Sequence, residues 1–276
     1  MMKMLAGQVG YQLRLLTRNP RGLMISLFAP GVILGLRLSQ GGPHGAAGSA
    51  GRAAVVAGLS AFGLIATCYL THAIGLVAAR ESGVLRRWQA SPLPRWGYFA
   101  GRITATVLLS LVSAAIILGV GASLGGLHVP AGSVPALLAV FVVGGVAWAA
   151  VGTAITALIS SAEGANPVLI FTYLPVILLS GAFGALSEPK WLTTLMSYLP
   201  GQPVIGSAAR ALEFTGSGLA PVSGRDLAVL GGWAVIGLLA SVRFFRWDPA
   251  RPAHARRARQ VQACSGTSSW AAPGNR

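Results

Sequence analysis

Charged residues are scarce in this chain of 276 residues, where Asp, Glu, Lys and Arg together make up 10%. A soluble domain of this length needs about a quarter of its residues charged to cover its surface. Hydrophobic residues make up 54% of the chain, and the mean hydropathy is +0.66. The apolar residues come in long blocks rather than in amphipathic stripes. The composition therefore excludes an ordinary soluble domain and indicates that lipid is the solvent.

Acidic residues and lysine are rarer still, with six Asp and Glu against 21 Lys and Arg and a formal net charge of +15. Only Lys3 and Lys190 are lysines. Such an Arg-, Ala- and Gly-rich composition is typical of a GC-rich bacterial genome. A basic balance often indicates nucleic acid. Here the positions of the charges fit a membrane protein better, so we expect no nucleic-acid partner.

Cysteine is nearly absent, and the two cysteines lie in different surroundings. Cys68 lies inside an apolar block and Cys264 lies in a polar tail, so we expect two unpaired thiols. No stretch of the sequence has the spacing of metal ligands. We therefore expect no metal site on this chain.

Six apolar blocks are candidates for membrane spans, and together they predict an all-α polytopic membrane protein with six transmembrane helices. They cover residues 22–36, 53–79, 103–124, 135–159, 167–186 and 227–242. The first is short, about 22 Å at 1.5 Å per residue, and needs Arg37 to snorkel. A cleaved signal peptide ending near residues 48–50 is the alternative. Because more spans follow, we favour a retained span.

The segments around these blocks complete the expected organisation. Residues 1–21 predict a basic amphipathic helix on the membrane surface. Residues 190–198 and 204–214 predict two amphipathic helices too short to span. We expect one transmembrane domain over residues 1–250 and a basic, disordered cytoplasmic tail over 251–276.

The basic residues are distributed unevenly between the two sides that six spans define. With the N terminus inside, 16 of the 21 basic residues fall on the inner segments and five on the outer ones. Since basic residues concentrate on the cytoplasmic side, both termini are predicted to be cytoplasmic in a multi-pass protein of the cell membrane.

A polar segment over residues 80–94 interrupts the apolar blocks on the predicted cytoplasmic side. On a helical wheel, Val84, Leu85 and Trp88 share one face, while Arg86 and Arg87 lie opposite. We expect Ser82 to cap the start of this helix and Pro92 and Pro94 to end it. Trp96 and Tyr98 are expected to anchor at the lipid head groups. The segment therefore predicts a short helix across the ends of two spans.

The sequence of this segment resembles a known family. The stretch Arg80-Glu81-Ser82-Gly83-Val84-Leu85-Arg86-Arg87-Trp88 resembles the loop between the second and third spans of type-2 ABC transporter permeases. Three further stretches resemble the same family in order and spacing. They are Leu179-Ser180-Gly181, the segment 200–212 ending in Ala208-Ala209-Arg210-Ala211-Leu212, and Phe244-Phe245-Arg246-Trp247-Asp248. The resemblance covers about residues 1–250.

The resemblance implies a membrane subunit of an exporter of drugs, lipids or polysaccharides. In that family the loop is a coupling helix that docks on a separate ATPase subunit, and two permeases and two ATPases form the transporter. Carried over to this chain, the coupling candidates are Arg80, Glu81, Leu85, Arg86 and Arg87. The expected partners are therefore an ABC ATPase, a second permease copy and the lipid bilayer.

The sequence contains no Gly-x-x-x-x-Gly-Lys-Ser/Thr phosphate loop, and neither Lys3 nor Lys190 lies in such a frame. We therefore expect no ATP hydrolysis and no cofactor on this chain, with ATP and Mg on the partner ATPase. Two alternatives remain open: an ion-coupled secondary carrier and an intramembrane enzyme acting on lipids. The scarcity of acidic residues at membrane depth disfavours the carrier. The enzyme would need a cluster of carboxylate, His or Ser side chains at that depth, where only His72 and scattered hydroxyls qualify.

A few polar residues within the apolar blocks are candidates for a substrate path, namely His72 with its neighbour Thr71, and Tyr173 in the fifth block. A packing role is the alternative for each. The small residues Gly144, Gly145 and Gly152 suit close contact between helices. Apolar spans with few polar groups favour a lipophilic or amphiphilic substrate.

Overall fold

All the regular structure in the described part of the chain is helical. The computed structural model describes residues 2–17, 24, 29–39, 48–85, 95–159, 162–180 and 190–245. The main elements are α1 (Met2–Thr17), α3 (Ala29–Ser39), α5 (Gly48–Ile65), the π-helical segment η2 (Ala66–Thr71), α6 (His72–Glu81), α8 (Arg95–Gly125), the 3₁₀ turn η3 (Ala131–Ser133), α9 (Val134–Ile155), α10 (Ala162–Leu179), α11 (Lys190–Met196), α12 (Gly201–Leu212) and α13 (Gly224–Phe244). The predicted all-α class is confirmed.

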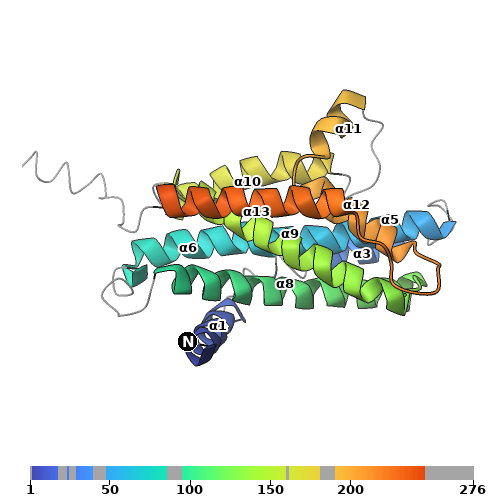
Figure 1. The fold of residues 1–276 in the computed structure, drawn as a ribbon, viewed down its shortest axis with the longest axis horizontal. Helices are drawn as coiled ribbons and strands as arrows, with labels where there is room; N and C mark the ends of the chain where they lie inside the picture. The colour runs from blue at the N-terminus through green and yellow to red at the C-terminus, as the bar shows by residue number, and fades with distance from the viewer. Residues whose placement is uncertain are drawn as a thin grey trace, which may run out of the picture.

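Long helices run side by side along the long axis of the molecule (Figure 1). Four of them are long and apolar enough to cross a membrane: Gly51–Glu81, Gly97–Leu124, Ala131–Ile155 and Gly224–Phe244. The first, made of α5, η2 and α6, has 83% of its most apolar window buried, against 22% for α13. The continuous helix α5–η2–α6 is therefore the centre of the bundle, and α13 lies at its edge.

The first and fifth predicted spans do not reach that length within the described residues. For the first, the structure describes α3 over 11 residues, which includes Arg37, while residues 25–28 lie outside the described part. For the fifth, the apolar helix is Gly164–Leu179, and residues 181–189 are likewise outside it. Four spans are thus supported by length and composition, and the count of six stays a prediction.

Glycines end two of the long helices. Gly83 at φ 71° follows α6, and Gly126 at φ 60° follows α8, a left-handed conformation that glycine adopts without a steric penalty. At the end of α8, the amide of Leu127 donates to the carbonyl of Gly121 at 3.2 Å. These stops place the chain reversals at opposite ends of the bundle (Figure 1).

Small residues bring the helices close together, as the sequence predicts. A Cβ atom added to Gly152 would lie 3.2 Å from the carbonyl oxygen of Tyr69, and one on Gly145 would lie 3.4 Å from the sulfur of Cys68. A Cβ on Gly144 would lie 2.6 Å from the side chain of Val204. The prediction of close contacts at these three glycines is confirmed.

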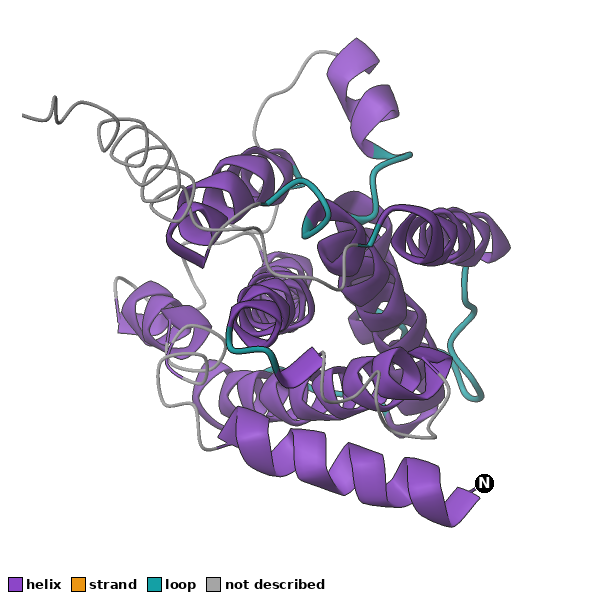
Figure 2. Cartoon of the chain, turned by 90° about the vertical axis from the view of Figure 1, so that its left-hand side faces the viewer, coloured by secondary structure: helices purple, strands orange, loops and turns teal. Residues whose placement is uncertain are grey.

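Helix α1 lies across the bundle rather than along it, as the view down the bundle shows (Figure 2). A helix within the predicted range 1–21 is confirmed, and its place on a membrane surface stays a prediction. The two short helices predicted near 190–198 and 204–214 are α11 and α12, with bounds shifted by a few residues. The predicted tail 251–276 lies outside the described residues.

Candidate functional site

Arg80, the first of the coupling candidates, has its side chain buried and points into the bundle. Its guanidinium donates to the carbonyl of Thr156 at 3.1 Å and also to the carbonyl of Ile159. Only 3% of Arg80 is exposed. Carbonyl groups at a helix end attract a cation. Arg80 therefore ties the end of α6 to the turn that follows α9.

Glu81 is the last residue of α6 and is exposed. The expectation that Ser82 caps the start of a new helix is wrong. Ser82 instead closes α6, because its amide donates to the carbonyl of Ala78 at 3.0 Å and its hydroxyl to that of Ala79 at 3.3 Å. The span and its acidic end thus form one continuous helix, which presents Glu81 at its tip.

Leu85 lies after the turn at Gly83 and is fully buried. It packs with Leu76 of α6 and Tyr98 of α8, beside Phe99 and Phe245. The rings of Phe99 and Phe245 meet edge to face, with centroids 5.0 Å apart. We call Leu76, Leu85, Tyr98, Phe99 and Phe245 the inner apolar cluster. It fixes the start of the segment 80–94 onto the span ends.

The expectation that Tyr98 anchors at lipid head groups is wrong, since Tyr98 is 3% exposed and its hydroxyl receives a hydrogen bond from Arg102. The coupling candidates Arg86 and Arg87 lie outside the described residues. Their contact with a partner stays a prediction.

Arg102 is buried within α8, although counting basic residues by loop assigns it to the cytoplasmic loop. Its guanidinium donates to the side-chain oxygen of Gln12 in α1 at 3.5 Å and to the backbone carbonyl of His72 at 3.2 Å. The guanidinium also covers Gly75, where an added Cβ would lie 2.5 Å from it. Arg102 therefore links the transverse helix α1 to the central helix.

His72 and Thr71, two of the substrate-path candidates, are both buried. The imidazole of His72 makes hydrogen bonds to the hydroxyls of Thr106 at 3.2 Å and Thr153 at 2.9 Å. These contacts join α6 to α8 and α9. Both ring nitrogens are engaged by the chain itself, which favours the packing role for His72. The substrate-path role of His72 and Thr71 stays a prediction.

Tyr173, the third substrate-path candidate, belongs to a row of aromatic side chains. It stacks on Tyr69 with centroids 6.2 Å apart, and Tyr69 in turn meets Trp148 edge to face at 5.6 Å. The hydroxyl of Tyr69 bonds to Thr172 at 2.5 Å, and the indole of Trp148 donates to the carbonyl of Pro200 at 3.3 Å. This row connects the central helix with α10, α9 and the start of α12.

The π-helical segment η2 supplies both Tyr69 and Cys68 to this packing, and all six of its residues are buried. π-helical segments are rare in proteins as a whole, and those that occur are often at functional sites, because the wider turn re-aims the side chains.

Within the described residues, no group of three His, Cys, Asp or Glu side chains could hold a metal ion.

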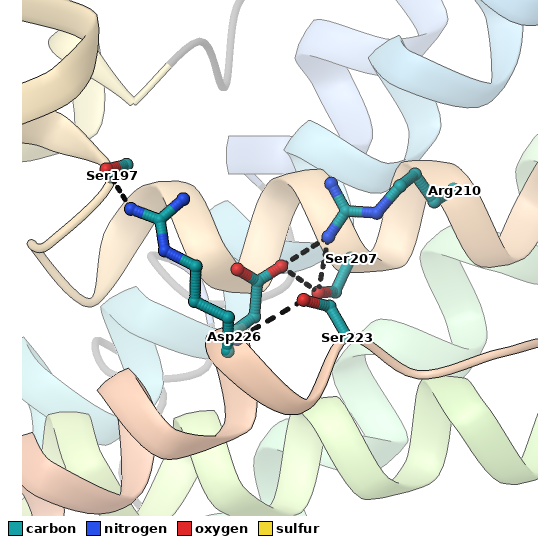
Figure 3. A network of polar contacts seen from close by, with 6 residues as sticks. Ser197, Ser207, Arg210, Ser223 and Asp226 are labelled. Atoms are coloured by element: carbon teal, nitrogen blue, oxygen red, sulfur yellow. Dashed lines mark hydrogen bonds and ion pairs between the residues drawn. The ribbon is translucent and has the colours of Figure 1, made fainter.

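A polar network at the opposite end of the bundle ties α12 to the start of α13 (Figure 3). Asp226 pairs with Arg210, and the hydroxyl of Ser207 donates to the same carboxylate at 2.6 Å. The hydroxyl of Ser223 caps α13 by accepting from the amide of Asp226 at 3.3 Å. We call Ser207, Arg210, Ser223 and Asp226 the outer clasp.

A sequence comparison decides the family of this chain. A model of the ABC-2 family of transporter proteins matches residues 43–243. The chain belongs to the ABC-2 transporter family. The resemblance to type-2 ABC transporter permeases is confirmed, and membership of the ABC-2 family makes the chain a membrane subunit for transport. No curated protein matches the chain in a sequence comparison.

Several contacts in this ABC-2 family chain could not be predicted from the sequence. Arg102 and Arg80 look like topological charges until their distant partners are known, since Arg80 and Ile159 are 79 residues apart. A usable signal is the spacing of Tyr98 and Arg102, because residues four apart share one face of a helix. The π-helical segment leaves no recognisable pattern in the apolar block.

Proposed function

We propose that this chain is the membrane-spanning permease subunit of an ATP-driven exporter, powered by a separate ATPase subunit. The observation that carries the proposal is the match to the ABC-2 transporter family over residues 43–243. Two copies of this chain, or this chain and a related one, pair with two ATPases. ATP and Mg bind the partner, since this sequence has no phosphate loop. With six spans both termini lie on the same side, and the concentration of basic residues on the inner segments supports a cytoplasmic location for both.

The surroundings of the polar residues support the proposed class of cargo. In the described spans, the buried imidazole of His72 is engaged by the hydroxyls of Thr106 and Thr153 on neighbouring helices. Exposed side chains on the spans are mostly large and apolar. A lipophilic or amphiphilic cargo, such as a drug, an antibiotic or a lipid-like molecule, fits such a chain best.

The segment 80–94 transmits the motion of the ATPase to the spans. Glu81, Arg86 and Arg87 make the contact with the partner, and two buried residues pass the motion on. Arg80 passes it to the end of α9 through the carbonyls of Thr156 and Ile159. Leu85 passes it to α6 and α8 through the inner apolar cluster. The division of roles is supported by exposure, since Glu81 is exposed while Arg80 and Leu85 are buried.

Reconstitution of the chain with its ATPase tests the proposal. In inside-out vesicles, we expect ATP-dependent uptake of a lipophilic fluorescent dye or stimulation of ATP hydrolysis by it. Glu81→Ala and Arg87→Ala should lower both uptake and co-purification of the ATPase several-fold. Arg225→Ala, which removes an arginine at the other end of the bundle, is the matched control. Unchanged uptake and association in both coupling variants would refute the assignment.

The buried arginine gives a second readout. Arg80→Ala should leave the ATPase bound, because Arg80 lies inside the bundle, yet should lower the amount of dye transported per ATP hydrolysed. Arg80→Lys keeps one charge near the carbonyls and should restore part of that ratio. Loss of ATPase binding in Arg80→Ala would show a direct contact instead.

A further inference from the structure

A cavity of about 610 Å³ opens at the end of the bundle that carries the outer clasp. Its walls come from three places: the start of α5, the turn between α8 and α9, and the loop between α12 and α13. A cavity of about 300–1,000 Å³ is the usual size of a small-molecule site. The residues that matter for its chemistry are Arg52, Leu127, His128, Leu212, Glu213 and Phe214.

The walls of this cavity are held in place by backbone contacts. The amide of Ala220 donates to the carbonyl of Gly132 at 2.9 Å. A Cβ on Gly132 would lie 1.8 Å from the carbonyl oxygen of Gly218, so the two loops touch through their backbones. A Cβ on Gly216 would lie 2.7 Å from the ring of Phe214. The cavity is therefore preformed rather than a gap between loose loops.

Arg52 brings a positive charge to the cavity. It is half-buried, and its guanidinium lies 3.8 Å from the position of a Cβ on Gly126, which lines the cavity. Among the residues that the structure describes, none forms an ion pair or hydrogen bond with its side chain. A half-buried guanidinium without a carboxylate partner favours an anionic ligand such as phosphate.

The cavity also contains a negative charge. Glu213 lines it and is exposed, and its carboxylate has no hydrogen-bond partner within the described part of the chain. A purely anionic ligand would meet the carboxylate as well as the guanidinium. A ligand with one charge of each sign would satisfy both groups. Opposite charges in one preformed cavity therefore favour a zwitterion.

The cavity lies where the apolar spans end, which is the depth at which lipid head groups are expected. The apolar spans on either side of it begin or end at Gly51, Leu124 and Ala131, each within a few residues of the lining. Leu127, Leu212 and Phe214 add an apolar wall next to the charges. A molecule that fits has a zwitterionic head and an apolar tail.

We propose that this cavity binds the head group of a zwitterionic amphiphile, with its phosphate at Arg52 and its ammonium at Glu213. The exposed imidazole of His128 adds a second donor for the phosphate. Binding needs no ATP and no partner subunit, so the proposal goes beyond the transport role and does not depend on it.

The test measures binding of three probes to the purified protein in an uncharged detergent, by native mass spectrometry and calorimetry. The probes are dihexanoylphosphatidylethanolamine, dihexanoylphosphatidylglycerol and free phosphoethanolamine. We expect one molecule of the first to bind per chain, several-fold tighter than either of the others. Equal affinity for the two lipids would overturn the zwitterion, and equal affinity for free phosphoethanolamine would overturn the amphiphile.

Variants locate the site. Arg52→Gln should weaken binding of both lipids about ten-fold, the usual cost of a lost charge-assisted hydrogen bond. Arg52→Lys, which keeps the charge, should retain part of the affinity and guards against a folding defect. Glu213→Gln should weaken only the ethanolamine lipid. Arg225→Gln, outside the cavity, should change neither. Wild-type affinity in Arg52→Gln and Glu213→Gln would overturn the proposal.

Discussion

The imidazole of His72 joins two long helices through its hydrogen bond to Thr153, with Nε2 and Oγ1 2.9 Å apart. Both residues are buried, and the other ring nitrogen of His72, Nδ1, makes a hydrogen bond with the hydroxyl of Thr106. One side chain therefore holds α6, α8 and α9 together near the π-helical segment that precedes it. This position gives the buried histidine a structural part in the bundle.

Replacing His72 should destabilise the protein. In His72→Ala the hydroxyls of Thr106 and Thr153 lose the imidazole, and such contacts between membrane helices are worth about 0.6–2 kcal/mol. We expect the midpoint of thermal unfolding in detergent to fall by several degrees, while the affinity for a transported dye stays unchanged. His128→Ala, which removes an exposed histidine, should keep the midpoint. An unchanged midpoint with altered dye affinity would instead place His72 in the substrate path.

The contact between α9 and α13 depends on Gly237. An added Cβ there would lie 2.8 Å from the carbonyl carbon of Ala150, 2.9 Å from its Cβ and 2.9 Å from the amide nitrogen of Val151. Gly237→Ala should therefore push α13 away from α9 and lower the thermal midpoint. A Cβ added at Gly231 on the same helix has no heavy atom within 4 Å, so Gly231→Ala should leave the thermal midpoint unchanged or raise it slightly. Equal midpoints in the two variants would contradict the packing described for α13.

Arg102 should decide how firmly α1 is held. Arg102→Ala removes the hydrogen bonds to Gln12, Tyr98 and the carbonyl of His72. We expect faster hydrogen exchange throughout residues 2–17, measured by mass spectrometry on the purified protein. Arg243→Ala, on the exposed side of α13, provides the control and should leave that exchange as in the wild type. Unchanged exchange in Arg102→Ala would show that α1 is held by other contacts.

The outer clasp should contribute little to global stability. Arg210 is 56% exposed at its side chain, against 17% for Asp226, and a pair so open to solvent is worth about 0–1 kcal/mol. A double-mutant cycle with Arg210→Gln and Asp226→Asn should therefore give a coupling energy below about 1 kcal/mol. Local hydrogen exchange in α12 should nevertheless rise in both single variants. A coupling above about 2 kcal/mol would mean that the pair is buried from solvent in the membrane.

The sequence alone predicts the features that lipid imposes. Long apolar blocks identify four of the helices, because every backbone group in a membrane must be bonded within its own helix. Glycines at 144, 145 and 152 correctly predict close helix contacts. The short helices α11 and α12 appear close to their predicted ranges. These features depend on local composition, which can be seen directly in the amino-acid sequence.

The sequence does not predict what individual polar residues do. Arg80, Arg102 and Tyr98 look like residues of a cytoplasmic loop, yet all three are buried. Their partners are set by how the helices pack: Arg102, for example, reaches Gln12 in α1 from a position 90 residues later in the chain. Ser82 fits the start of a helix as well as its end, and only the continuation of α6 to Glu81 decides between them.

The most direct measurement for the proposed transport mechanism is the sidedness of the coupling segment. A cysteine is introduced by Arg86→Cys or by Thr215→Cys in a chain that also carries Cys264→Ser. The remaining native cysteine, Cys68, is buried. A membrane-impermeant maleimide is then applied to inside-out and right-side-out vesicles. We expect position 86 to react only in inside-out vesicles and position 215 only in right-side-out vesicles. Reaction of position 86 from the outside would contradict the docking of this segment on a cytoplasmic ATPase.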